Sequence, residues 1–156
     1  IGLLKSARVK KGEAGESASE GKKPGNKDKD EDEDPAADLP PPVPGAVFEA
    51  SVFEHHWGTF GFGPELALFF NGRTILEPIA PKAGRNLVSF SRAADSLFSG
   101  FCWPETLEMV RGKPYMLYQK LGSGHVIAFT DDPNFRAMYR LPQRLFFNAV
   151  FFGPGH

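Results

Sequence analysis

GKPYMLYQKLGSGHVIAFTDDPNFR, residues Gly112–Arg136, contains two apolar runs joined by a short glycine-containing connector. Pro114–Leu121 and His125–Thr130 are rich in aromatic, β-branched and long apolar residues, and Gly122-Ser123-Gly124 lies between them. Two such runs with a short connector predict a β-hairpin. Asp131-Asp132-Pro133 follows the second run. Because Asp is favoured at a helix N-cap and Pro at the first helical position, we expect a helix to begin there.

Composition divides the chain at Gly45. All 15 Phe, 3 Tyr and 2 Trp follow this residue, and none precedes it. We therefore predict a single domain with one hydrophobic core over residues 45–156. Residues 12–44 combine Gly, Ser and Lys with an acidic run and a proline run. Such a segment cannot bury enough apolar surface to offset its loss of conformational entropy, so it is predicted to be a disordered linker or insertion.

The first residues of the chain differ from the linker that follows them. Residues 1–11 place Leu, Ala and Val between basic residues, which is typical of a short helix or of the end of an upstream element. The chain begins at Ile1 rather than Met, so we expect a fragment or a processed product. The linker is then an insertion between two elements of one fold, and surface insertions of this length cost little entropy.

Charge is balanced in the aromatic-rich part of the chain. Basic and acidic residues are almost equal in number from Gly45 onward. No field of one sign is therefore expected to recruit nucleic acid or an anionic membrane. No apolar run approaches the ~20 residues of a membrane-spanning helix. The single cysteine, Cys102, excludes an internal disulfide. We predict neither nucleic acid nor a membrane as a partner.

Short apolar runs bounded by Gly, Pro and Asn predict further strands and helices around the hairpin. The predicted strands are 46–54, 65–70, 73–79 and 86–91. One helical turn is predicted at 93–98, and Pro at the first position with Gly after the last predicts helices at 104–110 and 142–152. The fold class predicted from these elements is a β-rich α+β domain.

The last predicted helix is apolar around most of its circumference. Its polar positions are Gln143, Arg144 and Asn148. A helix that is apolar on most sides is buried on most sides. In a chain of this length, that pattern predicts a partner surface on polypeptide that is absent here.

The histidines do not form a zinc-protease pattern. Such a helix needs His-x-x-Glu or His-Glu-x-x-His, and neither occurs around His55, His56 or His125. Neighbouring residues in an extended segment point to opposite sides. The Glu54-His55-His56 cluster is therefore predicted to be a surface loop and not a metal site.

Two glycine-containing segments could be mistaken for catalytic motifs. Gly100-Phe101-Cys102-Trp103-Pro104 resembles a nucleophile elbow, in which glycines flank the nucleophile. Here Pro104 replaces the second glycine, and no pair of residues later in the chain would activate the thiol. Gly122-Ser123-Gly124 opens onto a strand rather than a helix, so it is predicted to be a turn and not a phosphate loop. Cys102 is predicted to be structural.

Asp132 and Arg136 have a structural explanation. Asp132 is predicted to cap a helix, and Arg136, four residues later, can pair with a carboxylate in the same turn. The sequence therefore yields no catalytic, cofactor-binding or metal-binding residue.

A set of short segments nevertheless forms a family pattern. Its main part is the run G-x-G-H-V-I-x-F-x-D-D-P-N-F-R, which includes Gly122, Gly124, Asp131, Asp132, Pro133 and Arg136. Supporting segments are Pro44–Phe48, Ser99–Phe101, Trp103–Glu105, Arg111–Pro114 and Arg144–Ala149. Together they resemble the C-terminal region of large bacterial zinc carboxypeptidase-family (metallocarboxypeptidase) proteins. The resemblance covers roughly residues 45–154.

The resemblance implies a fold and a context. In that family a catalytic carboxypeptidase domain precedes a domain similar to class I glutamine amidotransferases, which has a flavodoxin-like α/β fold. The family's zinc ligands and catalytic glutamate belong to the upstream domain, and no position here matches them. The chain is then expected to be half of a non-catalytic accessory domain, without a cofactor, in a periplasmic or secreted peptidase. Its expected partner is the upstream part of the same polypeptide, and without it we expect self-association through exposed apolar surface.

Two other functions remain open. The chain could be an independent ligand- or protein-binding module that uses the aromatic loops around Trp57 and Trp103. It could also be an enzyme that acts through Cys102.

Overall fold

The computed structural model describes residues 41–156. The predictions for residues 1–11 and for most of residues 12–44 lie outside this range. The end of the predicted linker is part of the sheet, because the first strand begins at Val43, whose side chain is fully buried.

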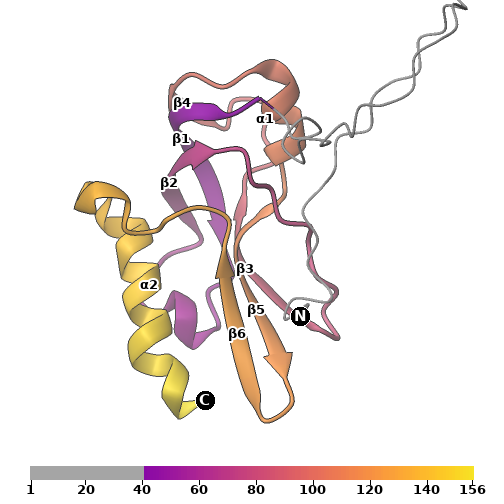
Figure 1. The fold of residues 1–156 in the computed structure, drawn as a ribbon, viewed down its shortest axis with the longest axis vertical. Helices are drawn as coiled ribbons and strands as arrows, with labels where there is room; N and C mark the ends of the chain where they lie inside the picture. Colours follow the sequence, from indigo (N-terminus) through magenta and orange to yellow (C-terminus); the bar gives the residue numbers. More distant parts are fainter. Residues whose placement is uncertain (1–40) are drawn as a thin grey trace, which may run out of the picture.

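The described residues form one curled antiparallel sheet (Figure 1). Its strands are β1 (Val43–Val52), β2 (Glu65–Gly72), β3 (Gly84–Phe90), β4 (Leu97–Gly100), β5 (Pro114–Leu121) and β6 (Gly124–Phe129). The strand order is β2-β1-β3-β5-β6, and β4 pairs with β1. All five strand pairings among the described residues are antiparallel.

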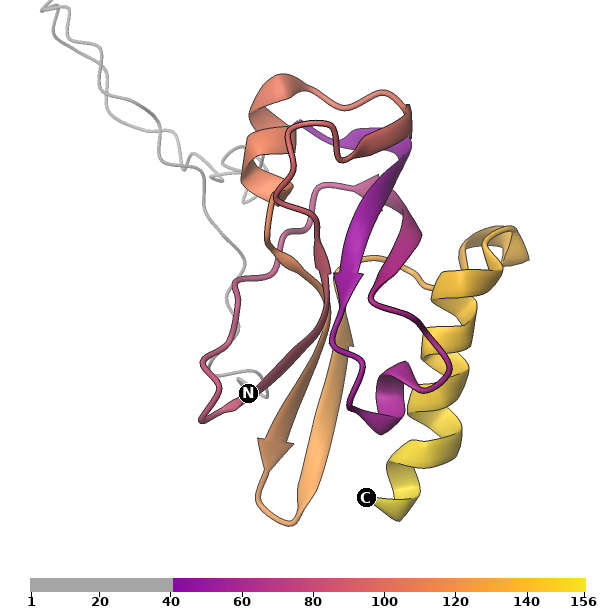
Figure 2. The same ribbon diagram turned by 180° about the vertical axis from the view of Figure 1, so that it is seen from behind.

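Two α-helices and three short 3-10 turns complete the architecture of residues 41–156. The helices are α1 (Pro104–Val110) and α2 (Arg140–Phe152), and the 3-10 turns are η1 (Trp57–Thr59), η2 (Phe135–Ala137) and η3 (Gly153–Gly155). Figures 1 and 2 show α2 along one side of the curled sheet, with η1 beside it. The α1 helix and β4 lie at the end of the sheet opposite the β5–β6 turn. Within residues 41–156, no helix has the length and apolarity needed to cross a membrane.

The core is built from aromatic rings on neighbouring strands. Phe48, Phe70 and Phe90 pack edge to face, with ring centroids 5.4–6.2 Å apart. Tyr115 on β5 packs edge to face against Phe90 at 6.1 Å. Leu145 of α2 is fully buried in the same core. Alternating residues of the strands therefore supply the inner face of the sheet, and α2 covers part of it.

The predicted hairpin is confirmed. β5 and β6 pair from Met116↔Phe129 to Leu121↔Gly124, which leaves Gly122 and Ser123 as a two-residue turn. Gly122 has φ +60°, and glycine at the first position of such a turn adopts this left-handed conformation without steric cost. The helix predicted at 104–110 is also confirmed, and α2 begins two residues before the predicted start.

Three predicted elements are wrong. Residues 73–79 contain one isolated bridge at Leu76 rather than a strand. The helical turn predicted at 93–98 is absent: residues 93–95 form a bend and a turn, and β4, which begins at Leu97, pairs with β1. No α-helix begins at Asp132, because Arg136 and Ala137 have positive φ angles of 50° and 54°, which interrupt a right-handed helix.

The fold class is therefore confirmed only at a coarse level. The domain is a mixed α/β structure with a β-hairpin and a C-terminal helix, as predicted. A flavodoxin-like domain is built on parallel strands, whereas the described sheet is antiparallel throughout. A partial flavodoxin-like fold is not confirmed.

Within residues 41–156, α2 is buried on one side only. Asn148, expected on the polar side, is buried, whereas Phe147 and Phe151 are exposed. The buried stripe consists of Pro142, Leu145 and Asn148, spaced by three residues along one side of the helix. The opposite side carries large apolar residues in contact with solvent. The helix therefore has one buried side and one exposed side, and the exposed side is also apolar.

Candidate functional site

Three segments meet at the end of the sheet that carries the β5–β6 turn. Figures 1 and 2 show η1, the hairpin and the C-terminal end of α2 at this end of the molecule. Their aromatic side chains form a cluster of five rings, which we call the ring cluster: His56, Trp57, Tyr118, His125 and His156.

The rings of the cluster alternate between imidazole and larger aromatic groups. Tyr118 lies between His56 and His125, with ring centroids at 4.9 and 5.3 Å. Trp57 lies 4.8 Å from His56 and 5.3 Å from His125, and it stacks on His156 with an interplanar angle of 5°. The three imidazoles are therefore brought together around Trp57 and Tyr118, although they are far apart in the sequence.

Asn148 of α2 fixes the position of η1. Its Nδ2 donates hydrogen bonds to the carbonyl oxygens of Gly58, at 3.2 Å, and Phe60, at 3.0 Å. The hydroxyl of Thr59 also donates to the carbonyl oxygens of Phe53 and His56. Since a buried amide is costly to leave unpaired, these bonds hold the loop in one conformation and set the direction of His56 and Trp57.

The orientation of His56 is set by a bond to its own loop. The Gly58 N–H donates to His56 Nδ1 at 3.0 Å. Nδ1 therefore acts as an acceptor, and the neutral ring carries its proton on Nε2. That proton is available to a group outside the loop.

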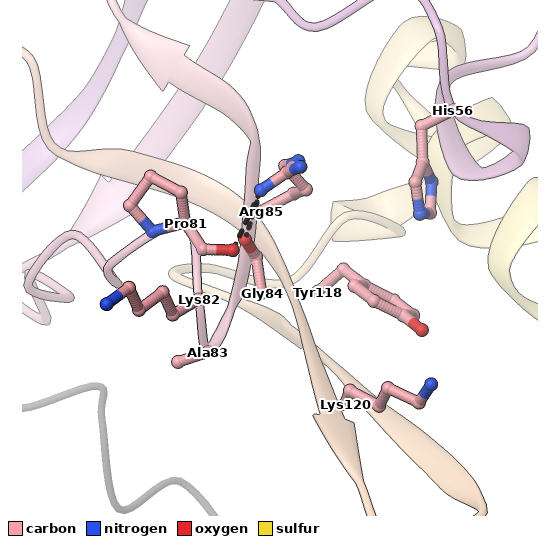
Figure 3. Close-up of a pocket in the computed structure, with 8 residues that line it drawn as sticks. All are labelled: His56, Pro81, Lys82, Ala83, Gly84, Arg85, Tyr118 and Lys120. Atoms are coloured by element: carbon pink, nitrogen blue, oxygen red, sulfur yellow. Dashed lines mark hydrogen bonds between the residues drawn. The ribbon is translucent and has the colours of Figure 1, made fainter.

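A pocket of about 260 Å³ opens beside the ring cluster (Figure 3). We call it the basic pocket. It is lined by His56, Pro81, Lys82, Ala83, Gly84, Arg85, Tyr118 and Lys120. None of the described residues in this lining is Asp or Glu, whereas four carry basic side chains.

Electrostatics at the pocket follow from this lining. The pKa of His56 is lowered, first by burial and then by the positive charges of His156, His125 and Arg85. Each of these charges opposes protonation of the imidazole. Burial and the neighbouring positive charges therefore both disfavour a positive charge on the His56 ring.

The ring cluster is not arranged as a metal site. Among residues 41–156, no group of three His, Cys, Asp or Glu side chains is placed to hold a metal ion. Trp57 and Tyr118 separate the imidazoles, and one nitrogen of His56 is already occupied by Gly58. The adjacent His55 is exposed and contributes a ring contact with Phe53 at 6.4 Å.

The structure separates the residues of the family pattern into two groups. Gly122 and Gly124 lie at the β5–β6 turn, whereas Asp131, Asp132, Pro133 and Arg136 follow the other end of β6.

Asp131 ties the end of β6 to the end of β2. Its Oδ2 accepts from the backbone N–H of Asn71 at 2.6 Å, and its Oδ1 accepts from the N–H of Asp132 at 2.8 Å. Burial raises the pKa of the Asp131 carboxyl, the Asn71 and Asp132 N–H groups lower it, and the Asp132 charge raises it. Asp132 accepts from the N–H of Asn134 at 2.8 Å, which closes a turn in place of the predicted helix cap. The Arg136 guanidinium lies over the ring of Phe135 at 5.1 Å.

Cys102 lies far from the ring cluster. Its side chain is buried, its Sγ lies 3.5 Å from the carbonyl oxygen of Trp103, and burial raises the pKa of the thiol. A buried thiol with a raised pKa is a poor nucleophile.

Trp57 and Trp103 do not share one surface. Trp103, which packs against Phe101 at 4.8 Å, precedes α1 at the opposite end of the sheet from η1. The two aromatic loops therefore cannot act together on one small ligand.

Sequence reasoning missed the basic pocket and the role of Asn148. Lys82, Arg85, Tyr118 and Lys120 come from two strands and a loop, and no local spacing identifies them as a group. The one usable signal was a single Asn in an otherwise apolar helix segment, because an amide there is either solvent-exposed or hydrogen-bonded inside.

Comparisons with known proteins do not identify the chain. No protein-family model, no curated protein and no solved structure matches it significantly.

Proposed function

We propose that the described domain is a non-catalytic accessory module of a larger zinc carboxypeptidase-like protein. In this proposal the outer face of α2 packs against another part of the same polypeptide. The family context is supported by the sequence pattern around Gly122–Arg136. The packing is supported by the exposed apolar side chains of α2.

The outer face of α2 is the observation that carries the proposal. Phe147, Val150 and Phe151 are 46%, 51% and 74% exposed, and they are spaced three and four residues apart on one side of the helix. Phe152 and Leu141 extend the exposed apolar surface. Exposing large apolar residues side by side is unfavourable in water, and such patches commonly mark protein–protein contacts.

The remaining parts of the proposal follow from the resemblance. The zinc ligands and the catalytic residues would reside in the peptidase domain, and this domain would support or position that enzyme. Parallel strands of a flavodoxin-like half-domain would have to come from outside residues 41–156. A periplasmic or secreted location belongs to the same proposal, as does self-association of the chain when its partner is absent.

A comparison of two polypeptides tests the packing. Phe151→Glu adds a charge to the outer face of α2 and leaves the core residue Leu145 untouched. In this chain alone, an exposed substitution should change the free energy of unfolding by less than about 0.5 kcal/mol. In a polypeptide extended upstream of Ile1, the same change should cost about 2 kcal/mol or more, because it buries an unpaired charge. Phe98→Glu, at an exposed apolar residue of β4 at the opposite end of the sheet, is the matched control.

Two results would contradict this function. Equal effects of Phe151→Glu in both polypeptides would show that nothing covers the outer face. Release of C-terminal residues from peptides by this chain with zinc, abolished by a chelator, would refute the non-catalytic role.

A second candidate is an independent binding module. The basic pocket favours it, because four basic side chains and Tyr118 line one opening. A self-contained module would be monomeric, would unfold cooperatively and would bind little hydrophobic dye. An accessory module without its partner would bind the dye, and Phe147→Ser with Phe151→Ser would reduce that binding.

A further inference from the structure

We propose that the basic pocket binds a small oxyanion that carries two or more negative charges, such as a phosphate-type or polycarboxylate ligand. The inference is independent of the accessory function, since it concerns a different surface. The basic pocket lies beside η1 and the β5–β6 hairpin, whereas the proposed docking surface is the outer face of α2.

Arg85 offers a fixed set of donors to such a ligand. Its Nη1 donates to the carbonyl oxygens of Pro81, at 2.8 Å, and Gly84, at 3.2 Å. These bonds hold the guanidinium in place at the rim of the pocket (Figure 3). The N–H groups on Nε and Nη2 are not used in these bonds, and a planar fork of this kind matches the oxygens of phosphate and carboxylate.

β5 supplies a second group of donors. Tyr118 and Lys120 are two residues apart on this strand, so their side chains lie on the same face of the sheet. Figure 3 shows the Lys120 amino group on the same side as the Tyr118 hydroxyl. His56 faces Tyr118 at a ring distance of 4.9 Å, and because its Nδ1 accepts from Gly58, the neutral ring carries its proton on Nε2.

The loop before Arg85 is held close to β5. The backbone N–H of Ala83 donates to the carbonyl oxygen of Ala80 at 2.9 Å. The backbone N–H of Lys120 donates to the carbonyl oxygen of Ala83 at 3.3 Å. A Cβ added to Gly84 would lie 2.0 Å from the Tyr118 carbonyl oxygen, so only glycine permits this approach. The loop that carries Arg85 is therefore fixed against β5 before a ligand arrives, which lowers the entropic cost of binding.

The charge of the pocket lining and the volume of the pocket indicate which class of ligand it can bind. The described lining contains basic residues and no carboxylate, so a bound anion would meet no like charge. The pocket volume of about 260 Å³ is below the ~300 Å³ at which sites for drug-sized molecules begin. A small oxyanion fits both conditions. More than one charge is needed because several cations share the opening.

Lys82 provides a matched control. It lines the same opening, but Figure 3 shows its amino group directed away from Tyr118, on the other side of the Pro81–Gly84 turn. Loss of Lys82 and loss of Lys120 change the net charge equally. If the anion is held by directed hydrogen bonds, its affinity should depend on Lys120 and not on Lys82. If it is held only by diffuse electrostatic attraction, loss of either lysine should weaken binding equally.

Calorimetric titration of the full chain at pH 6 and low salt tests the proposal, with pyrophosphate and citrate as separate probes. Binding by either probe is expected, and the stronger one identifies phosphate or carboxylate chemistry. Lys120→Gln and Arg85→Gln should each weaken binding by about tenfold, because each removes a charge-assisted hydrogen bond. Lys82→Gln should change it by less than about twofold. The Lys120→Gln and Lys82→Gln variants must have the melting temperature of the wild type, so that a change in affinity does not reflect a change in folding.

The pH dependence provides an independent readout. The groups around the opening that gain or hold positive charge are His56, His125, His156, Lys82, Arg85 and Lys120. Burial and the neighbouring positive charges lower the pKa of His56, so its ring is the group whose titration a bound anion would change. The bound anion should in turn raise the pKa of His56, measured by NMR titration of its ring protons. No binding of either probe at 10 mM (roughly the weakest affinity of interest), or equal loss in the Lys82→Gln and Lys120→Gln variants, would overturn the proposal.

Discussion

Asn148 should contribute more to stability than any other polar side chain on α2. It is 7% exposed, and its amide donates to two backbone carbonyl groups of the η1 loop, those of Gly58 and Phe60. Asn148→Ala removes both donors and leaves two carbonyl oxygens without this partner. Each hydrogen bond contributes about 0.5–1.5 kcal/mol net. The expected loss is therefore about 2 kcal/mol.

Urea unfolding followed by circular dichroism measures this loss. With a slope of about 1–3 kcal/mol per molar urea, a loss of about 2 kcal/mol lowers the midpoint by roughly 1 M. Gln143→Ala is the matched control, since Gln143 is a partly exposed amide on the same helix. The control should change stability by less than about 0.5 kcal/mol. The indole N–H resonance of Trp57 should shift in Asn148→Ala and not in Gln143→Ala.

Asn148→Asp separates loss of donors from loss of volume. A carboxylate has nearly the same shape but cannot donate to either carbonyl oxygen, so this variant should be less stable than Asn148→Ala at pH 7. The folded-state pKa of the new carboxyl should be raised by burial and by the facing carbonyl dipoles. A raised folded-state pKa means that protons bind the folded state preferentially, so part of the lost stability should return as pH falls from 7 to 4.5. If Asn148→Ala were no more destabilising than Gln143→Ala, the anchoring role of Asn148 would be refuted.

Three further predictions test other parts of the fold. Gly84→Ala should lower the free energy of unfolding by about 2 kcal/mol or more, because the added Cβ would lie 2.0 Å from the backbone oxygen of Tyr118. A lower melting temperature would show this loss. Tyr115→Phe should be neutral or stabilising by urea unfolding, since the buried hydroxyl makes no hydrogen bond with the described residues. Asp131 has a raised folded-state pKa, so the stability of the wild type relative to Asp131→Asn should increase as pH falls from 7 to 4, and a decrease would contradict this sign.

The hairpin and α1 could be predicted because their signals are local. Gly122-Ser123 joins two strands that pair directly, and Pro104 begins a helix that Gly112, with φ +68°, follows. β4 could not be predicted in this way. Its backbone pairs with Ala46–Phe48, so its conformation is set by a strand far away in the sequence.

The segment after β6 shows how tertiary contacts override a capping signal. Asp131-Asp132-Pro133 has the composition of a helix start, yet the Asp131 carboxylate bonds to Asn71 on β2. This contact fixes the exit of β6, and the chain then passes through left-handed residues at Arg136 and Ala137 before α2. A local rule predicts which groups can cap a helix but not which distant donors compete for them.

The candidate site was harder to predict than the fold because its members have separate origins. The sequence predicts His56 only as a loop residue with an unsuitable spacing for zinc. Its importance depends on Tyr118, Arg85 and Lys120, which become its neighbours only when β3, β5 and η1 meet. Alternation along β5 places Tyr118 and Lys120 on one face, but the sequence does not specify which loop covers that face.

The two sides of α2 connect the separate parts of the molecule. The inner side carries Leu145 into the core and uses Asn148 to hold η1, and therefore His56 and Trp57. The outer side carries Phe147 and Phe151 in solvent. Any partner that binds this outer side to the folded domain stabilises α2 by mass action. Since Asn148 bonds α2 to the η1 loop, docking should slow hydrogen exchange of the η1 loop in the wild type and should slow it less in Asn148→Ala.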